Sequence, residues 1–395
     1  MIVWRSIRFL SITRGRCRGC DQLRSYETPE YHPRLPLRPE LPGVWPLYRP
    51  DPAVALTFRN VQPSFVFAGL RLTPVITGGN AEVHHDNSRI TAPQCLHRGD
   101  APVIAHGDSV RIGAVAIHYL RWGEGSPSLL LLHGSSHCAG IWSPLAERLA
   151  ADGYTVVAAD LRGHGSSDKP EAGYGWQQMR DDIIGLIESL DLRDLILAGH
   201  SRGGGVSLLT AAAVPERVRG VFVYEPTMPL PSAPHHAPSG RRISQMAERA
   251  LARRSVFPSR DGLLGHWLTR DAFRNWDERY LRAYVDFGTV DREDGTIELR
   301  CPPRVEALLY AALADPEPWS ELSGPEVPVV AMFGANGGRV REGEDPAAGL
   351  RRMFPRCEST IMPGATHFGP MEYPELFYQA LRGFMDGDVS GGGTV

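Results

Sequence analysis

The pentapeptide at residues 199–203 reads Gly-His-Ser-Arg-Gly and sets a serine, Ser201, between two glycines. A mostly apolar run, 194–198, precedes it, and small helix-forming residues at 204–213 follow it. This order predicts a strand, a sharp turn and a helix, the setting in which a serine hydroxyl is exposed on a strained turn. The flanking glycines let two backbone segments approach where a Cβ would clash. Because so short a pattern also occurs by chance, the surrounding elements must decide its meaning.

Strands and helices alternate on both sides of this turn. Strands are predicted at 115–120, 128–133, 154–159, 218–224, 327–333 and 359–362, and helices at 141–151, 176–190, 346–354 and 372–385. The second strand is a continuous apolar run, which is typical of a strand buried on both faces. The alternation predicts an α/β fold with a mostly parallel, doubly wound sheet and helices on both faces.

The alternation stops in the segment 227–325. Helices are predicted there at 244–255, 261–269 and 277–287, separated by Pro/Gly breaks, so we expect a helical cap over the carboxyl edge of the sheet. The cap splits the core into 106–226 and 326–386. Its aromatic side chains pack mainly within the cap, and we expect some to face the cleft; they are Trp267, Phe273, Trp276, Tyr280 and Tyr284.

The first 105 residues have a different composition from the rest. They are rich in proline and arginine and show no regular apolar period, so residues 1–105 are predicted to be disordered. A second hypothesis is that translation starts downstream, near Val103 or Val110, which would make this segment a non-native extension. Residues 387–395 are predicted to form a flexible tail.

Composition limits the classes of partner. With a net charge of −3 over 395 residues, no nucleic acid or acidic membrane surface is expected as a partner. No apolar stretch is long enough to span a membrane and no secretory signal is evident. Six scattered cysteines favour the reducing cytoplasm. Cys17 and Cys20 lack a second nearby pair, so neither a metal nor a cofactor is expected. The partner is then a small-molecule substrate, and the oligomeric state stays open.

Four segments carry a resemblance. In chain order, His133-Gly134 ends a strand, Asp-Leu-Arg-Gly-His-Gly-Ser-Ser-Asp at 160–168 ends the next, the 199–203 turn ends the third, and Gly-Ala-Thr-His-Phe at 364–368 follows the last. In this order and spacing the chain resembles the α/β-hydrolase superfamily, in its capped, serine-nucleophile form, over about residues 110–386. Residues 1–105 lie outside the resemblance.

The resemblance implies roles for four residues. Ser201 becomes the nucleophile, and His367 the base that a serine hydroxyl needs at neutral pH. The backbone N–H groups of Arg202 and Ser135 become the two donors of an oxyanion hole.

The acid that orients the histidine is not where most family members carry it. That position, three residues after the glycine that closes the 327–333 strand, is Gly337. Glu225, at the end of the 218–224 strand, is the replacement that some relatives use, and a carboxylate there would hold the histidine tautomer. Glu342 and Asp345 in the following loop are the competing candidates.

The expected function is that of a cofactor-independent serine hydrolase. It would cleave a carboxylic ester or lactone of a small to medium, mainly apolar substrate through an acyl-enzyme on Ser201. On position alone, Trp142, Met228 and Leu230 are the candidate substrate-binding residues. The alternatives are a carbon–carbon bond hydrolase or lyase on the same triad, and a ligand-binding protein that turns nothing over.

Overall fold

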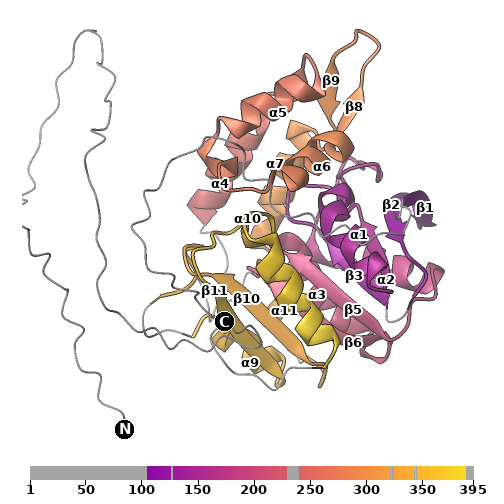
Figure 1. The fold of residues 1–395 in the computed structure, drawn as a ribbon, viewed down its shortest axis with the longest axis vertical. Coiled ribbons are helices and arrows are strands. Elements are labelled where there is room, and N and C mark those ends of the chain that lie inside the picture. Colours follow the sequence, from indigo (N-terminus) through magenta and orange to yellow (C-terminus); the bar gives the residue numbers. More distant parts are fainter. Residues whose placement is uncertain are drawn as a thin grey trace, which may run out of the picture. The chain divides into compact units, whose positions relative to one another are not determined.

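A computed structural model describes residues 105–125, 128–228, 240–320, 322, 324–341, 343 and 345–387. Its main sheet has eight strands in the order β1-β2-β4-β3-β5-β6-β10-β11 (Figure 1). They are β1 (His106–Ile112), β2 (Val115–Trp122), β3 (Ser128–Leu132), β4 (Thr155–Ala159), β5 (Leu195–His200), β6 (Val218–Tyr224), β10 (Val329–Gly334) and β11 (Cys357–Met362). At one edge β1 pairs antiparallel with β2, and β2 pairs antiparallel with β4. The remaining neighbours in the sheet, from β4 across β3, β5, β6 and β10 to β11, pair parallel.

The inner strands are buried on both sides because successive side chains enter two separate apolar clusters. One cluster takes Leu130 and Leu132 of β3 and packs them against helices α2 (Trp176–Ser189), α3 (Arg202–Ala213) and α9 (Ala348–Met353). The other takes Leu129 and Leu131 and packs them against α1 (Ser143–Ala151) and α11 (Pro374–Met385). The predicted mostly parallel, doubly wound sheet is therefore confirmed.

The segment between β6 and β10 holds more than the predicted helices. It contains α4 (Gly240–Leu251), α5 (Arg260–Leu268), α6 (Glu278–Gly288), α7 (Pro303–Ala311) and α8 (Glu317–Ser320). Helices α4 to α7 gather with β8 and β9 in the upper part of the view in Figure 1. A small antiparallel sheet, β7 (Val256–Phe257), β9 (Ile297–Leu299) and β8 (Thr289–Asp291), accompanies them. The prediction missed this sheet because its strands have two or three residues, too few to show an alternating pattern.

Helix α7 was also missed, although it carries Tyr310, which lines the cavity of the candidate site. It begins at Pro303, directly after Pro302. The two prolines read as a break in the sequence, but proline is well tolerated in the first turn of a helix, where its missing N–H would have no intrahelical partner.

Several predictions fall on residues outside the described part of the chain. These are the disorder of 1–104, the Cys17/Cys20 pair, Leu230, Glu342 and the tail at 388–395. Along the described part, none of the helices has the length and hydropathy that a membrane crossing requires.

Candidate active site

Ser201 occupies the sharp turn between β5 and α3. Its backbone has φ 53° and ψ −116°, a conformation that L-residues rarely adopt, and its N–H donates to the carbonyl of Tyr224 on β6 at 3.0 Å. The turn needs both of its glycines. A Cβ on Gly199 would lie 2.5 Å from the backbone of Gly203, and a Cβ on Gly203 would lie 2.2 Å from the carbonyl oxygen of Leu132.

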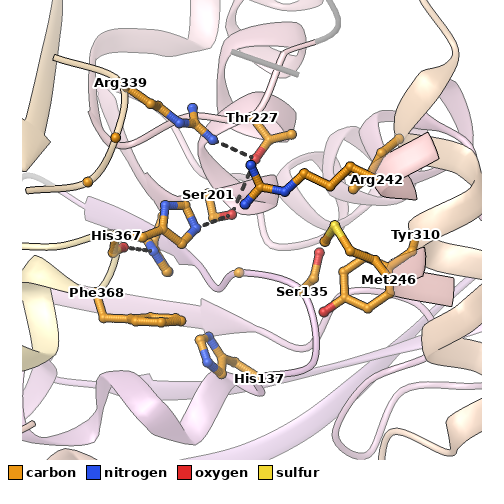
Figure 2. A pocket seen from close by; sticks show the side chains of 15 residues that line it. Ser135, His137, Ser201, Thr227, Arg242, Met246, Tyr310, Arg339, His367 and Phe368 are labelled. Atoms are coloured by element: carbon orange, nitrogen blue, oxygen red, sulfur yellow. Dashed lines mark hydrogen bonds between the residues drawn. The ribbon is translucent and has the colours of Figure 1, made fainter. Parts of the chain in front are cut away.

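His367 follows β11 and precedes the short helix α10 (Gly369–Glu372). Its Nε2 lies 3.0 Å from Ser201 Oγ, and Figure 2 shows the imidazole directed at the serine across the floor of a cavity. The distance is that of a hydrogen bond, so the imidazole can take the hydroxyl proton.

Glu225 lies behind the histidine, at the end of β6. Its Oε2 is 3.4 Å from His367 Nδ1, and the side chain is completely buried. Two further donors fix the carboxylate: the N–H of Gly334 reaches Oε1 at 3.0 Å and Nε of Arg339 reaches Oε2 at 2.9 Å. Ser201, His367 and Glu225 therefore form a continuous chain of polar contacts.

The competing acid Asp345 lies elsewhere. It is exposed, its Oδ1 accepts from the N–H of Ala347 at 3.0 Å, and its other oxygen pairs with Arg351. These contacts account for Asp345 as a residue that anchors the loop in front of α9.

The charges around His367 favour its neutral form. Burial lowers the pKa of His367 below its ordinary value, and the guanidinium groups of Arg339 and Arg242 lower it further, while the contact with Glu225 opposes them. A neutral imidazole is the form that accepts a proton. The electrostatics thus keep the base available at neutral pH.

The two expected oxyanion donors belong to segments next to the serine, since Arg202 follows it and a Cβ built on Gly134, the neighbour of Ser135, would lie 3.3 Å from the Cβ of Ser201. Arg202 is the first residue of α3, where backbone N–H groups have no intrahelical partner. Ser135 lies in a turn closed by a hydrogen bond of 3.3 Å from the N–H of His137 to the carbonyl of Gly134. The Arg202 side chain ties the two together, since its Nε donates to Ser135 Oγ at 3.0 Å.

A cavity of about 490 Å³ opens over Ser201. The core contributes Ser135 and Arg339 to its wall, and the segment between β6 and β10 contributes Thr227, Arg242, Met246 and Tyr310 (Figure 2). Thr227 Oγ1 lies 3.2 Å from Ser201 Oγ and 3.4 Å from a terminal nitrogen of Arg339. The wall next to the nucleophile is therefore polar and positively charged.

The substrate-binding residues predicted from position are wrong where the structure describes them. Trp142 is buried against Phe377, with ring centroids 6.0 Å apart, and Met228 is fully buried. Neither lines the cavity. Both follow strand ends near the site, but their side chains turn into the apolar clusters on either side of the sheet.

The expectation that some of the five named cap aromatics face the cleft is also wrong, although Tyr310, a cap aromatic it did not name, lines the cavity. Trp267 stacks on Tyr284 at 4.7 Å and on Phe273 at 5.1 Å, and Phe273 meets Trp276 at 5.0 Å. None of these rings lines the cavity, and neither does Tyr280. The cavity is lined instead by Arg242 and Arg339 together with Met246, Tyr310 and Phe368.

Sequence reasoning missed Thr227, Arg242 and Arg339. Thr227 had a usable signal, since it lies two residues after the candidate acid. Arg339 lies two residues after Gly337, where the usual acid is missing. Arg242 gave no signal, because its place depends on how α4 packs. No group of three or more His, Cys, Asp or Glu that could hold a metal ion occurs among the residues with described positions.

Known proteins resemble this chain over its described core. The profile of the alpha/beta hydrolase family matches residues 129–380. The chain is 30% identical over 278 residues to 2-(acetamidomethylene)succinate hydrolase of Mesorhizobium japonicum, a match that covers 70% of this chain and 94% of that protein. It is 38% identical over 121 residues to fluoroacetate dehalogenase of a Burkholderia species, covering 29% of this chain and 39% of that protein.

A solved structure agrees. The crystal structure of E-2-(acetamidomethylene)succinate hydrolase superposes with a TM-score of 0.62 and 26% identity, covering 72% of this chain and all of that one. The sheet, the sharp serine turn and the sequence matches lead to the same assignment: the chain belongs to the alpha/beta hydrolase family.

Proposed function

We propose that this hydrolase cleaves the acyl bond of a small, carboxylate-bearing molecule through an acyl-enzyme on Ser201. The observation that carries the proposal is the 3.0 Å contact between Ser201 Oγ and His367 Nε2, with Glu225 behind the imidazole. His367 takes the proton as Oγ attacks the substrate carbonyl, and the N–H groups of Ser135 and Arg202 receive the developing oxyanion.

The second half of the reaction uses the same groups. His367 passes its proton to the leaving group, which departs and leaves the acyl group on Ser201. Water then attacks the acyl-enzyme, with His367 again taking a proton, and the acid product leaves with Ser201 restored. Glu225 holds the imidazole so that Nε2 faces the serine, and stabilises the imidazolium each time it forms.

The charge of the cavity supports an anionic substrate. Arg242 on α4 and Arg339 after β10 both line the wall around Ser201. Arg241 and Arg249 add positive charge to the outer face of α4, next to Arg242. Although Arg339 is paired with Glu225, a group of arginines beside a cleft raises the local concentration of anionic ligands, and a guanidinium matches a carboxylate in shape.

The relative from Mesorhizobium supports the same class of substrate. Its name describes a succinate, which is a dicarboxylate, that bears an acetamido group. A carboxylic ester is the primary candidate bond here, since an alcohol leaves more readily than an amine. An amide is the second candidate, because that relative is named for a substrate that contains one.

Two matched esters test the proposal. The p-nitrophenyl monoester of succinate and p-nitrophenyl butyrate have acyl chains of equal length, but one ends in a carboxylate and the other in a methyl group. We expect kcat/KM to favour the succinate ester by about tenfold or more after subtraction of spontaneous hydrolysis, since hydrogen bonds to charged groups contribute about 1.5–3 kcal/mol. Ser201→Ala should abolish turnover of both.

The Arg242→Leu variant, compared with wild type, tests whether Arg242 causes the preference for the succinate ester. The ratio of kcat/KM for the two esters should shift towards butyrate in this variant. A wild-type preference for butyrate, or a ratio that Arg242→Leu leaves unchanged, would count against the anionic substrate. Loss of all turnover on both esters in wild type would instead count against the acyl-enzyme.

A further inference from the structure

Ser136, next to the expected oxyanion donor Ser135, has an unusual backbone. It is the third residue of the turn that Gly134 opens and His137 closes, and its φ is 70°. Turns with a positive φ at this place normally carry glycine or asparagine there. A serine keeps this conformation only when its surroundings hold it.

Four side chains from other parts of the chain contact Ser136, and one of them is Tyr310, whose hydroxyl lies 3.3 Å from the hydroxyl of Ser136. The N–H of Ser136 donates to Nε2 of His164 at 3.1 Å. Its carbonyl accepts from the hydroxyl of Tyr284, on α6, at 2.7 Å. Its own hydroxyl donates to the carboxylate of Glu306, on α7. Three of the four partners therefore come from the segment between β6 and β10.

Glu306 is itself fixed. Only 4% of the residue is exposed. Its Oε2 pairs with a terminal nitrogen of Arg253 at 2.8 Å, and the hydroxyl of Tyr310 donates to Oε1 at 3.3 Å. A buried carboxylate with these partners has little freedom to move, so it is a rigid anchor for the hydroxyl of Ser136.

A second link joins the same turn to α7. The buried Arg202 side chain donates through Nε to Ser135 Oγ at 3.0 Å and through a terminal nitrogen to the carbonyl of Leu309. Residues 134–137, the start of α3 and helix α7 thus form one connected network. The turn cannot relax without breaking contacts to α6 or α7.

We propose that Tyr284 and Glu306 are positioning residues that hold the 134–137 turn, and through it the Ser135 N–H, in the geometry that receives the oxyanion. The inference rests on the proposed function for what the turn does. It makes helices α6 and α7 part of the catalytic apparatus, and α7 also lines the cavity through Tyr310. Neither side chain contacts the substrate; both act through Ser136.

Two tyrosines of α6 give a matched test. Tyr284→Phe and Tyr280→Phe each remove one hydroxyl from a buried ring, but Tyr280 lines a separate surface groove beside Arg148 and Glu375. On p-nitrophenyl butyrate we expect Tyr284→Phe to lower kcat about tenfold at nearly unchanged KM, less than the hundredfold or more that loss of an oxyanion donor costs. Tyr280→Phe should keep the wild-type kcat.

Glu306 provides the second pair of variants. Glu306→Gln keeps an oxygen that can accept from Ser136 and should retain most of the wild-type kcat, whereas Glu306→Leu should lower kcat as Tyr284→Phe does. The rate at which a fluorophosphonate labels Ser201 should fall in parallel with kcat, because both depend on the oxyanion geometry. Unfolding temperatures of all four variants show whether each is folded at the assay temperature.

The outcomes separate this inference from the proposed function. Wild-type labelling together with equal kcat for Tyr284→Phe and Tyr280→Phe overturns the positioning role and leaves the acyl-enzyme standing. A loss confined to KM in Tyr284→Phe also overturns it, since that would indicate substrate binding. Wild type that neither labels nor hydrolyses either ester overturns the proposed function and this inference together.

Discussion

The carboxylate of Glu225 occupies the space that a side chain at Gly337 would need, since a Cβ built on Gly337 would lie 2.3 Å from Oε1 of Glu225. Gly337 occupies the position where most members of the superfamily carry the acid, and the carboxylate of Glu225 reaches His367 from the end of the neighbouring strand, β6. The absence of a side chain at 337 is therefore what lets the carboxylate of Glu225 lie beside the histidine. The missing acid and its replacement form one coupled change.

This coupling predicts the behaviour of a double variant. Gly337→Asp alone should lose nearly all activity, because the new side chain displaces the Glu225 carboxylate and sets two acids against each other. Adding Glu225→Ala removes the collision and should restore part of the kcat. Steady-state hydrolysis of the better of the two esters measures both. If the double variant is no more active than Gly337→Asp, the two positions are not interchangeable.

Replacement of Glu225 alone tests its role. Glu225→Gln keeps the size of the side chain and removes the charge that holds the imidazole. We expect kcat to fall by orders of magnitude, towards the roughly 10⁴-fold loss that the equivalent change causes in serine proteases. Asp345→Asn is the control and should retain activity, since Asp345 contacts Ala347 and Arg351. Near-normal turnover by Glu225→Gln would remove it from the triad.

Burial, and to a lesser extent Arg339, lowers the pKa of His367 and so the pH at which the base loses its function. His367 must be neutral to act, and burial together with the cations of Arg339 and Arg242 lowers its pKa. The acidic limb of kcat/KM in wild type should therefore lie below about pH 6.5, the ordinary histidine value. Activity is lost as pH falls through that limb.

Removing the positive charge of Arg339 should shift the acidic limb of the pH profile of kcat/KM. Arg339→Met leaves Glu225, Arg242, His200 and His137 around His367 and should raise the pKa of His367, which shifts the limb to higher pH. Arg339→Lys keeps the charge and should shift it less. The measurement is kcat/KM against pH for the three proteins, and an unchanged or lower limb in Arg339→Met would contradict the account.

Buried histidines should make the fold sensitive to mild acid. Burial is the main reason why the pKa of His137 falls to about 3. In the unfolded chain His137 binds a proton near pH 6.5, and in the folded chain it does not. The free energy of unfolding is therefore at its full value above about pH 6.5 and decreases as the pH falls towards 3. His137 alone should cost about 2 kcal/mol between about pH 7 and about pH 5.

Urea unfolding of wild type and His137→Gln at both pH values checks this figure. The variant should lose less stability on acidification than wild type by about that amount. Equal losses in the two proteins would mean that His137 is protonated in the folded state.

The parts of the site that depend on chain order could be predicted from the sequence. Ser201, His367 and Glu225 each follow a strand of a parallel sheet, and the carboxyl ends of such strands meet at one edge, so their proximity follows from topology. The cavity wall did not follow, because Arg242 and Tyr310 reach it from helices whose placement depends on packing. The aromatic rings of that segment looked like a binding surface, yet burying them against one another removes more apolar area from water.

The most direct test of the acyl-enzyme is covalent labelling of Ser201. Wild-type protein and the Ser201→Ala variant are treated with a fluorophosphonate. The intact mass of each protein is measured first, and peptide mapping then locates the adduct. The account predicts one adduct per wild-type chain, located on Ser201, and none on Ser201→Ala. A folded wild-type protein that takes up no label, or takes it up equally in both proteins, would contradict the claim that Ser201 is an activated nucleophile.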